Sequence, residues 1–201
     1  GKKVDVNLNT LVYIGINSSY GDLASLYMRY AISSAINRNE ICQNAYFNSA
    51  TPATGFFNPV FEATKAVQTL NTSPNKELTI ENLNKMGYNK INAQGFFTIP
   101  NGTVLSYSLL VNTENRSRVL AANLIENQLK DAGINIKVDE KPYAEYMALL
   151  QSGNYQLYLG EINILPNMDL SPLVLQGGSA AFGVGLEPPI VDETGAALPS
   201  S

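Results

Sequence analysis

The residue best suited to ligand chemistry in this sequence is an acid in a turn, Asp169. It ends the segment Pro166-Asn167-Met168-Asp169, which follows a predicted buried strand. Its carboxylate could pair with a cationic group of a ligand, and Asn167 adds a second polar side chain to the same turn. The alternative reading is structural, because an aspartate here can also cap the helical turn that begins at Leu170. The two roles are compatible.

Other candidate ligand-binding residues lie at predicted strand ends. One set continues the strand that leads toward Asp169, a second ends an early strand, and an aromatic residue follows a small-residue stretch near the C-terminus. A solvent-facing edge or an ordinary core position is the alternative for each of them. These candidates are Glu161, Ile162 and Asn163, then Tyr13 and Asn17, and finally Phe182.

Composition excludes several classes of function. The 201 residues include no histidine and no tryptophan. The absence of histidine removes Ser-His-Asp and Cys-His catalysis and the usual zinc sites, so we expect no metal and no cofactor. Thirteen Lys and Arg against seventeen Asp and Glu give a net charge of -4 without a basic cluster, which argues against nucleic-acid binding. Hydrophobic residues make up 45%, enough for a folded core.

Enzymatic alternatives are weakly supported by the remaining motifs. The stretch Gly177–Ala181 lacks the lysine and the strand-loop-helix context of a phosphate-binding loop. Two acid pairs, Asp139 with Glu140 and Glu187 with Asp192, are adjacent only in sequence, whereas glycosidase chemistry needs a defined spatial separation. Arg116 and Arg118 begin a predicted helix and could bind an anion. We therefore expect a binding protein rather than an enzyme, with a purely structural surface domain as a third class.

The elements that must position these residues follow a strand-helix-strand-helix-strand rhythm over Val104–Gly160. The predicted helices cover 116–132 and a stretch that begins at Pro142, and they alternate with strands ending near Val111, Val138 and Gly160. This order predicts right-handed crossovers and a mainly parallel sheet flanked by helices, an α/β fold. Ligands gather at the carboxyl ends of such strands, which points to Gly160 onward and to the turn after Val111.

The N-terminal half predicts further elements around this unit. One or two strands fall within Val4–Asn17, and Asp22 is expected to cap a helix that reaches Ile36. Shorter helices are expected over Glu40–Tyr46 and Thr79–Met86, the second ended by Gly87. A β-hairpin is expected to join Phe96–Ile99 to Val104–Val111 through Pro100-Asn101-Gly102.

Five collinear blocks resemble the family 5 extracellular solute-binding proteins, the oligopeptide, dipeptide and nickel receptors of ABC importers. The resemblance covers about residues 8–183, whereas Glu161 stands where many peptide receptors carry tryptophan, and Asn37 where the family usually has aspartate. The last stretch, 185–201, departs from the pattern. The blocks are Met28–Ile41, Asn48–Pro59, Leu110–Val138, Gly153–Leu157 and Pro166–Ser179.

The resemblance implies a fold and a function. Residues 1–201 would form a single ligand-binding lobe, periplasmic-binding-protein-like, from a larger receptor of two lobes that closes around a small solute, in particular a short peptide. Backbone at Glu161–Asn163 would pair with the extended peptide, Asp169 would meet its amino terminus, and nothing would be turned over. The partners would be ABC permease subunits and the missing lobe. The parent would be extracytoplasmic and anchored by a lipid, and a sugar oligomer or metal chelate is the alternative ligand.

Overall fold

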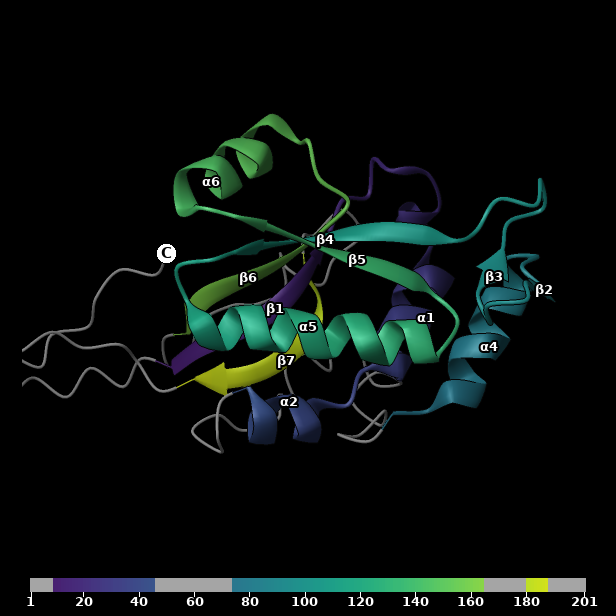
Figure 1. The fold of residues 1–201 in the computed structure, drawn as a ribbon, viewed down its shortest axis with the longest axis horizontal. Coiled ribbons are helices and arrows are strands. Elements are labelled where there is room, and N and C mark those ends of the chain that lie inside the picture. The colour runs from purple at the N-terminus through teal and green to yellow at the C-terminus, as the bar shows by residue number, and fades with distance from the viewer. Residues whose placement is uncertain (1–8, 46–73, 165–179, 188–201) are drawn as a thin grey trace, which may run out of the picture.

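The computed structural model describes residues 9–45, 74–164 and 180–187, which form a five-stranded sheet with helices on both faces and a small two-stranded sheet at one end (Figure 1). The elements in chain order are β1 (Asn9–Ile16), the 3-10 helix η1 (Gly21–Ala24), α1 (Leu26–Ala35), α2 (Arg38–Asn44), α4 (Lys76–Lys85), β2 (Lys90–Ile91), β3 (Phe97–Thr98), β4 (Ser106–Asn112), α5 (Arg116–Asp131), β5 (Asn135–Lys141), α6 (Tyr143–Ser152), β6 (Leu157–Ile164) and β7 (Ala180–Glu187).

The strand order in the main sheet is β5-β4-β6-β1-β7. β4 pairs in parallel with β5 and β6, whereas β1 is antiparallel to both β6 and β7. Four of the five strands therefore run in one direction and only β1 is reversed, which confirms the mainly parallel sheet. The helices α5 and α6 connect the parallel strands, and they lie on opposite sides of the sheet (Figure 1).

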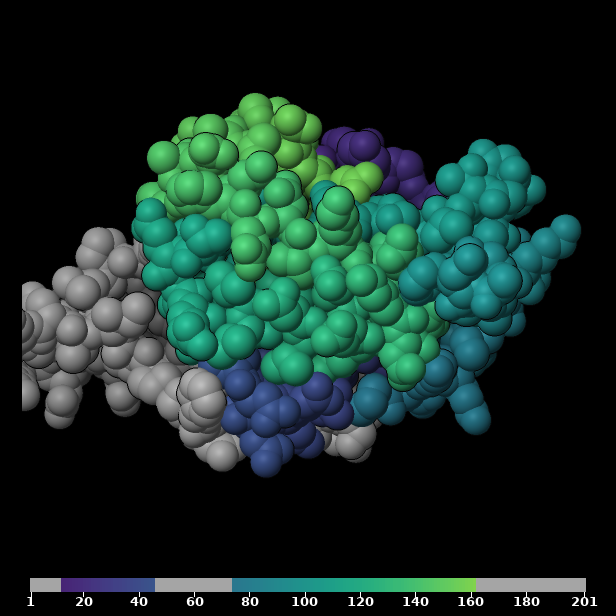
Figure 2. Space-filling model, viewed as in Figure 1, coloured from purple at the N-terminus to yellow at the C-terminus, as the bar shows by residue number. Residues whose placement is uncertain are grey.

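The core lies between the sheet and the layer formed by α1, α2 and α5, which contact one another. In Figure 2, α5 covers the middle of this side, with α6 above it and α2 below. α5 packs on β4 and β5 through its three-four spaced apolar face. The fully buried residues include Val12, Ile14, Leu109, Val111, Ala121, Ile125 and Leu129.

Side-chain caps fix where the helices begin. Asn115 accepts a hydrogen bond from the Arg118 N–H at 3.2 Å, so α5 begins directly after β4. Asn37 caps α2 by accepting from the Glu40 N–H at 3.0 Å. An asparagine at position 37 therefore supplies the acceptor that an aspartate would supply, and its role here is structural. Gly133, with φ +95°, ends α5 in the left-handed conformation expected after such a helix.

Two sequence-based predictions need correction. Asp22 does not cap a long helix: it lies in η1 and accepts a hydrogen bond from the Tyr88 hydroxyl, while Ser25 caps α1. The predicted hairpin forms only in its first steps: the Thr98–Val104 bridge is flanked by hydrogen bonds from the Ile99 N–H to the Thr103 carbonyl and from the Leu105 N–H to the Phe97 carbonyl, both 2.8 Å, and β3 also pairs with β2. The chain then leaves the turn to join the main sheet as β4, where burial of its apolar face is greater.

Candidate ligand-binding site

The carboxyl ends of β4 and β6 separate, and this separation creates the candidate site. The two strands pair at only two positions, Leu109 with Leu157 and Leu110 with Tyr158, although β4 continues to Asn112 and β6 to Ile164. β6 remains paired with β1 along its whole length, from Leu157 to Ile164. Among the described residues, β6 therefore has one paired edge and, beyond Tyr158, one edge without a strand partner.

The register decides which backbone groups face that open edge. The Asn17 N–H donates to the Gln156 carbonyl at 2.9 Å, which makes these two residues a hydrogen-bonded antiparallel pair. Because such pairs alternate, the N–H and C=O groups of Gly160 and Ile162 point toward β1. Those of Glu161 and Asn163 point toward the open edge. Within the predicted segment 161–163, the groups that face away from β1 therefore belong to the first and third residues.

Glu161 presents its backbone, and its side chain is turned inward. The carboxylate forms an ion pair with Arg118 in the first turn of α5, and both side chains are only 3% exposed. The Glu161 residue as a whole is nevertheless partly exposed, so the accessible part is the main chain. The ion pair ties β6 to the start of α5 at the carboxyl end of the sheet. This arrangement favours a positioning role for the carboxylate.

Tyr146 of α6 reaches the sheet where β4 and β6 separate. Its hydroxyl donates to the Leu159 carbonyl at 2.8 Å, and the residue is only 4% exposed. Burial raises the pKa of the Tyr146 hydroxyl above its ordinary value, with Tyr158 adding to the rise and Arg118 opposing it. The hydroxyl is therefore neutral and can donate at any physiological pH. Among the described residues, Leu159 marks the point beyond which β6 has an open edge.

Two tyrosines and two glycines form a close-packed layer where β1 and β6 pair. Tyr13 lies opposite Gly160 and Tyr158 opposite Gly15, and the two hydroxyls are 3.1 Å apart. A Cβ atom on Gly15 would lie 2.0 Å from the Tyr158 ring. The rings therefore occupy the space that side chains at the glycines would fill. Tyr13 is buried at 8% exposure, so the apo chain holds this predicted ligand residue within the sheet face.

Asn17 holds the loop that leads into β6. Its side-chain amide donates to the carbonyls of Tyr155 at 2.7 Å and Gly153 at 3.2 Å, and its carbonyl oxygen accepts from the Ser19 N–H at 3.1 Å. These bonds give Asn17 a structural role at the end of the sheet opposite the separation of β4 and β6. A direct ligand contact by Asn17 stays a prediction.

Asn112 is a candidate that sequence reasoning missed. It ends β4 and is 2% exposed; among the described residues its Nδ2 has no hydrogen-bond partner, although its Oδ1 accepts from the Glu114 N–H at 3.0 Å. A buried amide donor without an acceptor is uncommon, because its desolvation is uncompensated. The signal that could have identified Asn112 is the predicted ligand site at the turn after Val111, because Asn112 is the first residue of that turn.

The other predicted residues are only partly covered by the structure. Asp169 and Asn167 lie outside the described residues. Ile162 and Asn163 pair with Leu11 and Thr10 of β1, and Phe182 pairs with Ile14 from the other side of β1. β1 therefore stands between β6 and the strand that carries Phe182, so these two groups of candidates lie in one sheet but on different strands.

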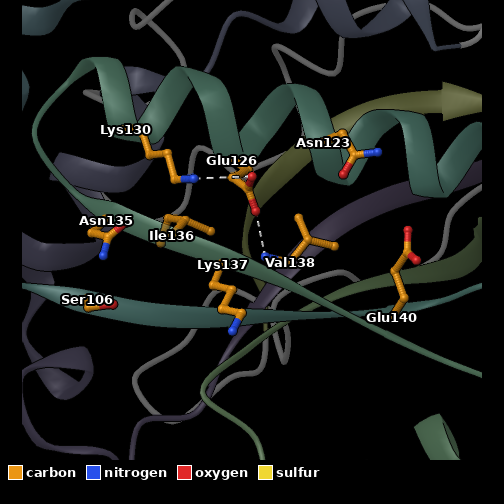
Figure 3. Close-up of a pocket in the computed structure, with 9 residues that line it drawn as sticks. All are labelled: Ser106, Asn123, Glu126, Lys130, Asn135, Ile136, Lys137, Val138 and Glu140. Atoms are coloured by element: carbon orange, nitrogen blue, oxygen red, sulfur yellow. Dashed lines mark hydrogen bonds and ion pairs between the residues drawn. The ribbon is translucent and has the colours of Figure 1, made fainter.

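A polar groove runs between α5 and β5, the opposite border of the sheet (Figure 3). Its volume is about 580 Å³, and Glu126 crosses it. The Glu126 carboxylate accepts from the Val138 N–H at 2.7 Å and from the Lys130 ammonium at 3.3 Å. Glu126 thus occupies the Val138 N–H, a donor that a further strand would need in order to pair with β5. One border of the sheet is closed by a carboxylate, whereas the edge of β6 beyond Tyr158 is open among the described residues.

Neither a metal site nor a membrane span emerges from the part of the chain that the structure describes. No group of three or more His, Cys, Asp or Glu is arranged there to hold a metal ion. None of the helices in these ranges combines the length and apolar character that crossing a bilayer requires.

The fold is an α/β arrangement with a mainly parallel sheet flanked by helices. The sequence matches the family described as bacterial extracellular solute-binding proteins, family 5, over residues 2–183. The chain therefore belongs to this family. Comparison with curated protein sequences gives no significant match.

Solved structures share this fold. A periplasmic oligopeptide-binding protein from Thermotoga maritima with bound mannohexaose is 23% identical, with a TM-score of 0.66 over 76% of this chain and 30% of its own. AppA from Bacillus subtilis, in complex with a nonapeptide, is 18% identical, with a TM-score of 0.66 over 83% of this chain and 35% of its own. NikA from Brucella suis, with Fe(III)-EDTA, is 16% identical, with a TM-score of 0.63 over 77% and 31%. This chain spans about a third of the length of these proteins.

Proposed function

We propose that this chain is one lobe of a non-enzymatic receptor that captures short peptides outside the cytoplasm and delivers them to an ABC permease. In this proposal a second lobe closes over the carboxyl ends of β4 and β6, and the closed form is the one that the permease recognises. The parent receptor is held at the membrane by a lipid. Membership of family 5 and the fold shared with periplasmic binding proteins support this assignment.

The open edge of β6 carries the proposal. Among the described residues β6 has no strand partner beyond Tyr158 on the side away from β1, and the alternating register directs the amide groups of Glu161 and Asn163 to that side. An extended peptide added at this edge would form main-chain hydrogen bonds without regard to its side chains. Such recognition suits a receptor for peptides of many sequences, because the backbone is their common feature.

Asp169 completes the proposed peptide site as the partner of the peptide amino terminus. In the sequence it follows the last residue of β6 by a few positions. In this proposal the strand edge fixes the direction of the peptide, and the carboxylate fixes where the peptide begins.

A different solute on the same scaffold is the second candidate function. The solved structures that share the fold hold mannohexaose, a nonapeptide and Fe(III)-EDTA in their respective complexes. A nickel complex is less favoured, because this chain contains no histidine to contribute a ligand. Backbone groups on a strand edge favour a peptide over a sugar, since a peptide presents matching donors and acceptors at the strand repeat.

The bound solute identifies the function directly. The full-length receptor is purified without added ligand and denatured gently, and the released small molecules are identified by mass spectrometry. A mixture of short peptides of unrelated sequence supports backbone-directed capture, and Asp169→Asn is then the first variant to measure. Release of a single sugar or chelate would support a solute receptor and contradict the peptide as its ligand. An empty protein without a thermal shift on adding peptides would contradict solute binding and favour a structural domain.

A further inference from the structure

We infer that the outer edge of β5 is an interface for a second copy of this chain, and that Glu126 of α5 keeps this edge closed. The inference concerns the border of the sheet at β5 and does not involve the ligand. β5 is the end strand of the main sheet, and among the described residues it pairs only with β4. An unprotected edge of this kind readily pairs with a strand of another molecule.

The register of β4 and β5 shows which backbone groups face outward. At one end of β5, the Asn135 N–H donates to the Leu105 carbonyl at 3.0 Å. At the other end, the Lys141 carbonyl accepts from the Thr113 N–H at 3.0 Å. The odd-numbered residues of β5 therefore direct their backbone groups toward β4. The residues that direct theirs outward are Ile136, Val138 and Glu140.

Glu126 closes the central one of these three outward-facing positions. Its carboxylate accepts from the Val138 N–H at 2.7 Å and from the Lys130 ammonium at 3.3 Å, and Figure 3 shows the side chain reaching from α5 toward β5. Only 23% of the Glu126 side chain is exposed, so it lies against the strand. A backbone N–H has one proton to donate, so Val138 has none left for the strand of another molecule while this bond persists.

The sequence of β5 is complementary to itself when two copies run antiparallel about a two-fold axis at Val138. Val138 would then exchange both hydrogen bonds with its counterpart, and Ile136 would exchange them with Glu140 of the second copy. Lys137 of each copy would lie opposite Asp139 of the other, at a closely spaced position without hydrogen bonds. Opposite charges that face each other in this way stabilise a pair of strands.

Charge also selects this register over its neighbours. An axis at Lys137 would place two lysines directly opposite each other, and an axis at Asp139 would do the same with two aspartates. Both side chains are accessible to a second copy, because Lys137 is exposed and Asp139 is 41% exposed, in a loose pair with Lys141 at 3.5 Å. The occupant that fits the edge is therefore another β5 strand.

The test measures self-association of the full-length receptor by sedimentation velocity. Glu126→Ala and Glu126→Met remove the acceptor, the second with little change in side-chain length, whereas Glu126→Gln keeps an oxygen that can accept from the Val138 N–H. Without Glu126, a dimer no longer has to break two hydrogen bonds, each equivalent to about fivefold, so we expect the Ala and Met variants to dimerise at least about 25-fold more tightly than the wild type. Glu126→Gln should remain close to the wild type.

Charge variants locate the interface within the Glu126→Ala protein. Adding Asp139→Lys places lysines opposite lysines and should weaken the dimer to the level of the wild type. Adding Lys137→Asp as well restores opposite charges and should restore the dimer. Asp131→Lys is the matched control, because Asp131 is 83% exposed at the end of α5 and does not line the groove, so the dimer should be unchanged.

Three results would overturn the inference. The first is that the Glu126→Ala and Glu126→Met proteins stay monomeric while unfolding in urea as cooperatively as the wild type; if one of them does not fold, the other decides. The second is a dimer that survives Asp139→Lys, which would place the contact elsewhere. The third is a wild type that dimerises as tightly as Glu126→Ala, because Glu126 would then not close the edge. These measurements contain no ligand, so they decide the role of Glu126 whether or not the receptor binds peptides.

Discussion

Neutralising Glu161 should destabilise the protein severely, because the substitution removes the buried carboxylate that pairs with the Arg118 cation. Arg118 and Glu161 form an ion pair in which each side chain is 3% exposed. Removal of one member of such a pair typically costs about 3–5 kcal/mol, whereas replacement of both by apolar residues of similar volume is nearly neutral or stabilising. We therefore expect Glu161→Gln to lose about 3–5 kcal/mol of the free energy of unfolding. For a chain of this size that corresponds to a fall in Tm of roughly 6–20 °C.

The assay is urea unfolding of a double-mutant cycle. The four proteins are the wild type, Glu161→Gln, Arg118→Met and the double variant, and we expect the double variant to be more stable than either single one. Lys130→Met is a matched control, because the Lys130–Glu126 pair is more exposed, at 39% and 23%, and should contribute less than about 1 kcal/mol. A loss below about 1 kcal/mol for Glu161→Gln, or additive effects in the double variant, would refute the buried pair.

Three further predictions concern packing, pH and capping. Gly15→Ala should cost about 1–3 kcal/mol, because its Cβ would lie 2.0 Å from the Tyr158 ring, and Tyr158→Ala in the same chain should relieve most of the added strain; equal costs with and without the ring would contradict this. Burial raises the pKa of Tyr88, Tyr107 and Tyr146, so the folded state favours their neutral forms. The stability that this contributes is present below about pH 10 and is lost as the pH rises above it. Absorbance at 295 nm should therefore show part of the eleven tyrosines titrating only on alkaline unfolding, rather than all together near pH 10. Asn115→Ala should cost about 1 kcal/mol in urea unfolding through loss of the α5 cap, whereas Asn115→Asp should be close to neutral.

Much of the α/β unit is predictable from the sequence because local signals agree there with the fold. The apolar spacing of Leu120–Leu129 and the glycine after Ala132 mark α5, and Pro142 and Gly153 bracket α6. The resemblance to family 5 proteins, carried by collinear blocks, is confirmed by the family match over residues 2–183. Local propensity and sequence order were sufficient for these elements.

The site is less predictable because it depends on contacts distant in sequence. From the sequence alone, Glu161 would be taken for an exposed acid at the end of a strand. In the structure, the α5–β6 packing brings Arg118, 43 residues earlier, beside it. The orientation of backbone groups along β6 requires its register with β1, which joins residues about 145 positions apart. The predicted hairpin after β3 stops at Leu105 for the same reason, since a local turn motif does not show that the following residues join the main sheet.

The most direct test of peptide capture at the β6 edge is residue-resolved amide exchange of the full-length receptor with and without a saturating short peptide. The register predicts an alternating response, because Glu161 and Asn163 face the open edge whereas Ile162 is already paired with β1. We expect the amides of Glu161 and Asn163 to become strongly protected on binding, with Ile162 unchanged. Tight peptide binding that leaves Glu161 and Asn163 exchanging as in the unliganded protein would contradict strand addition at this edge.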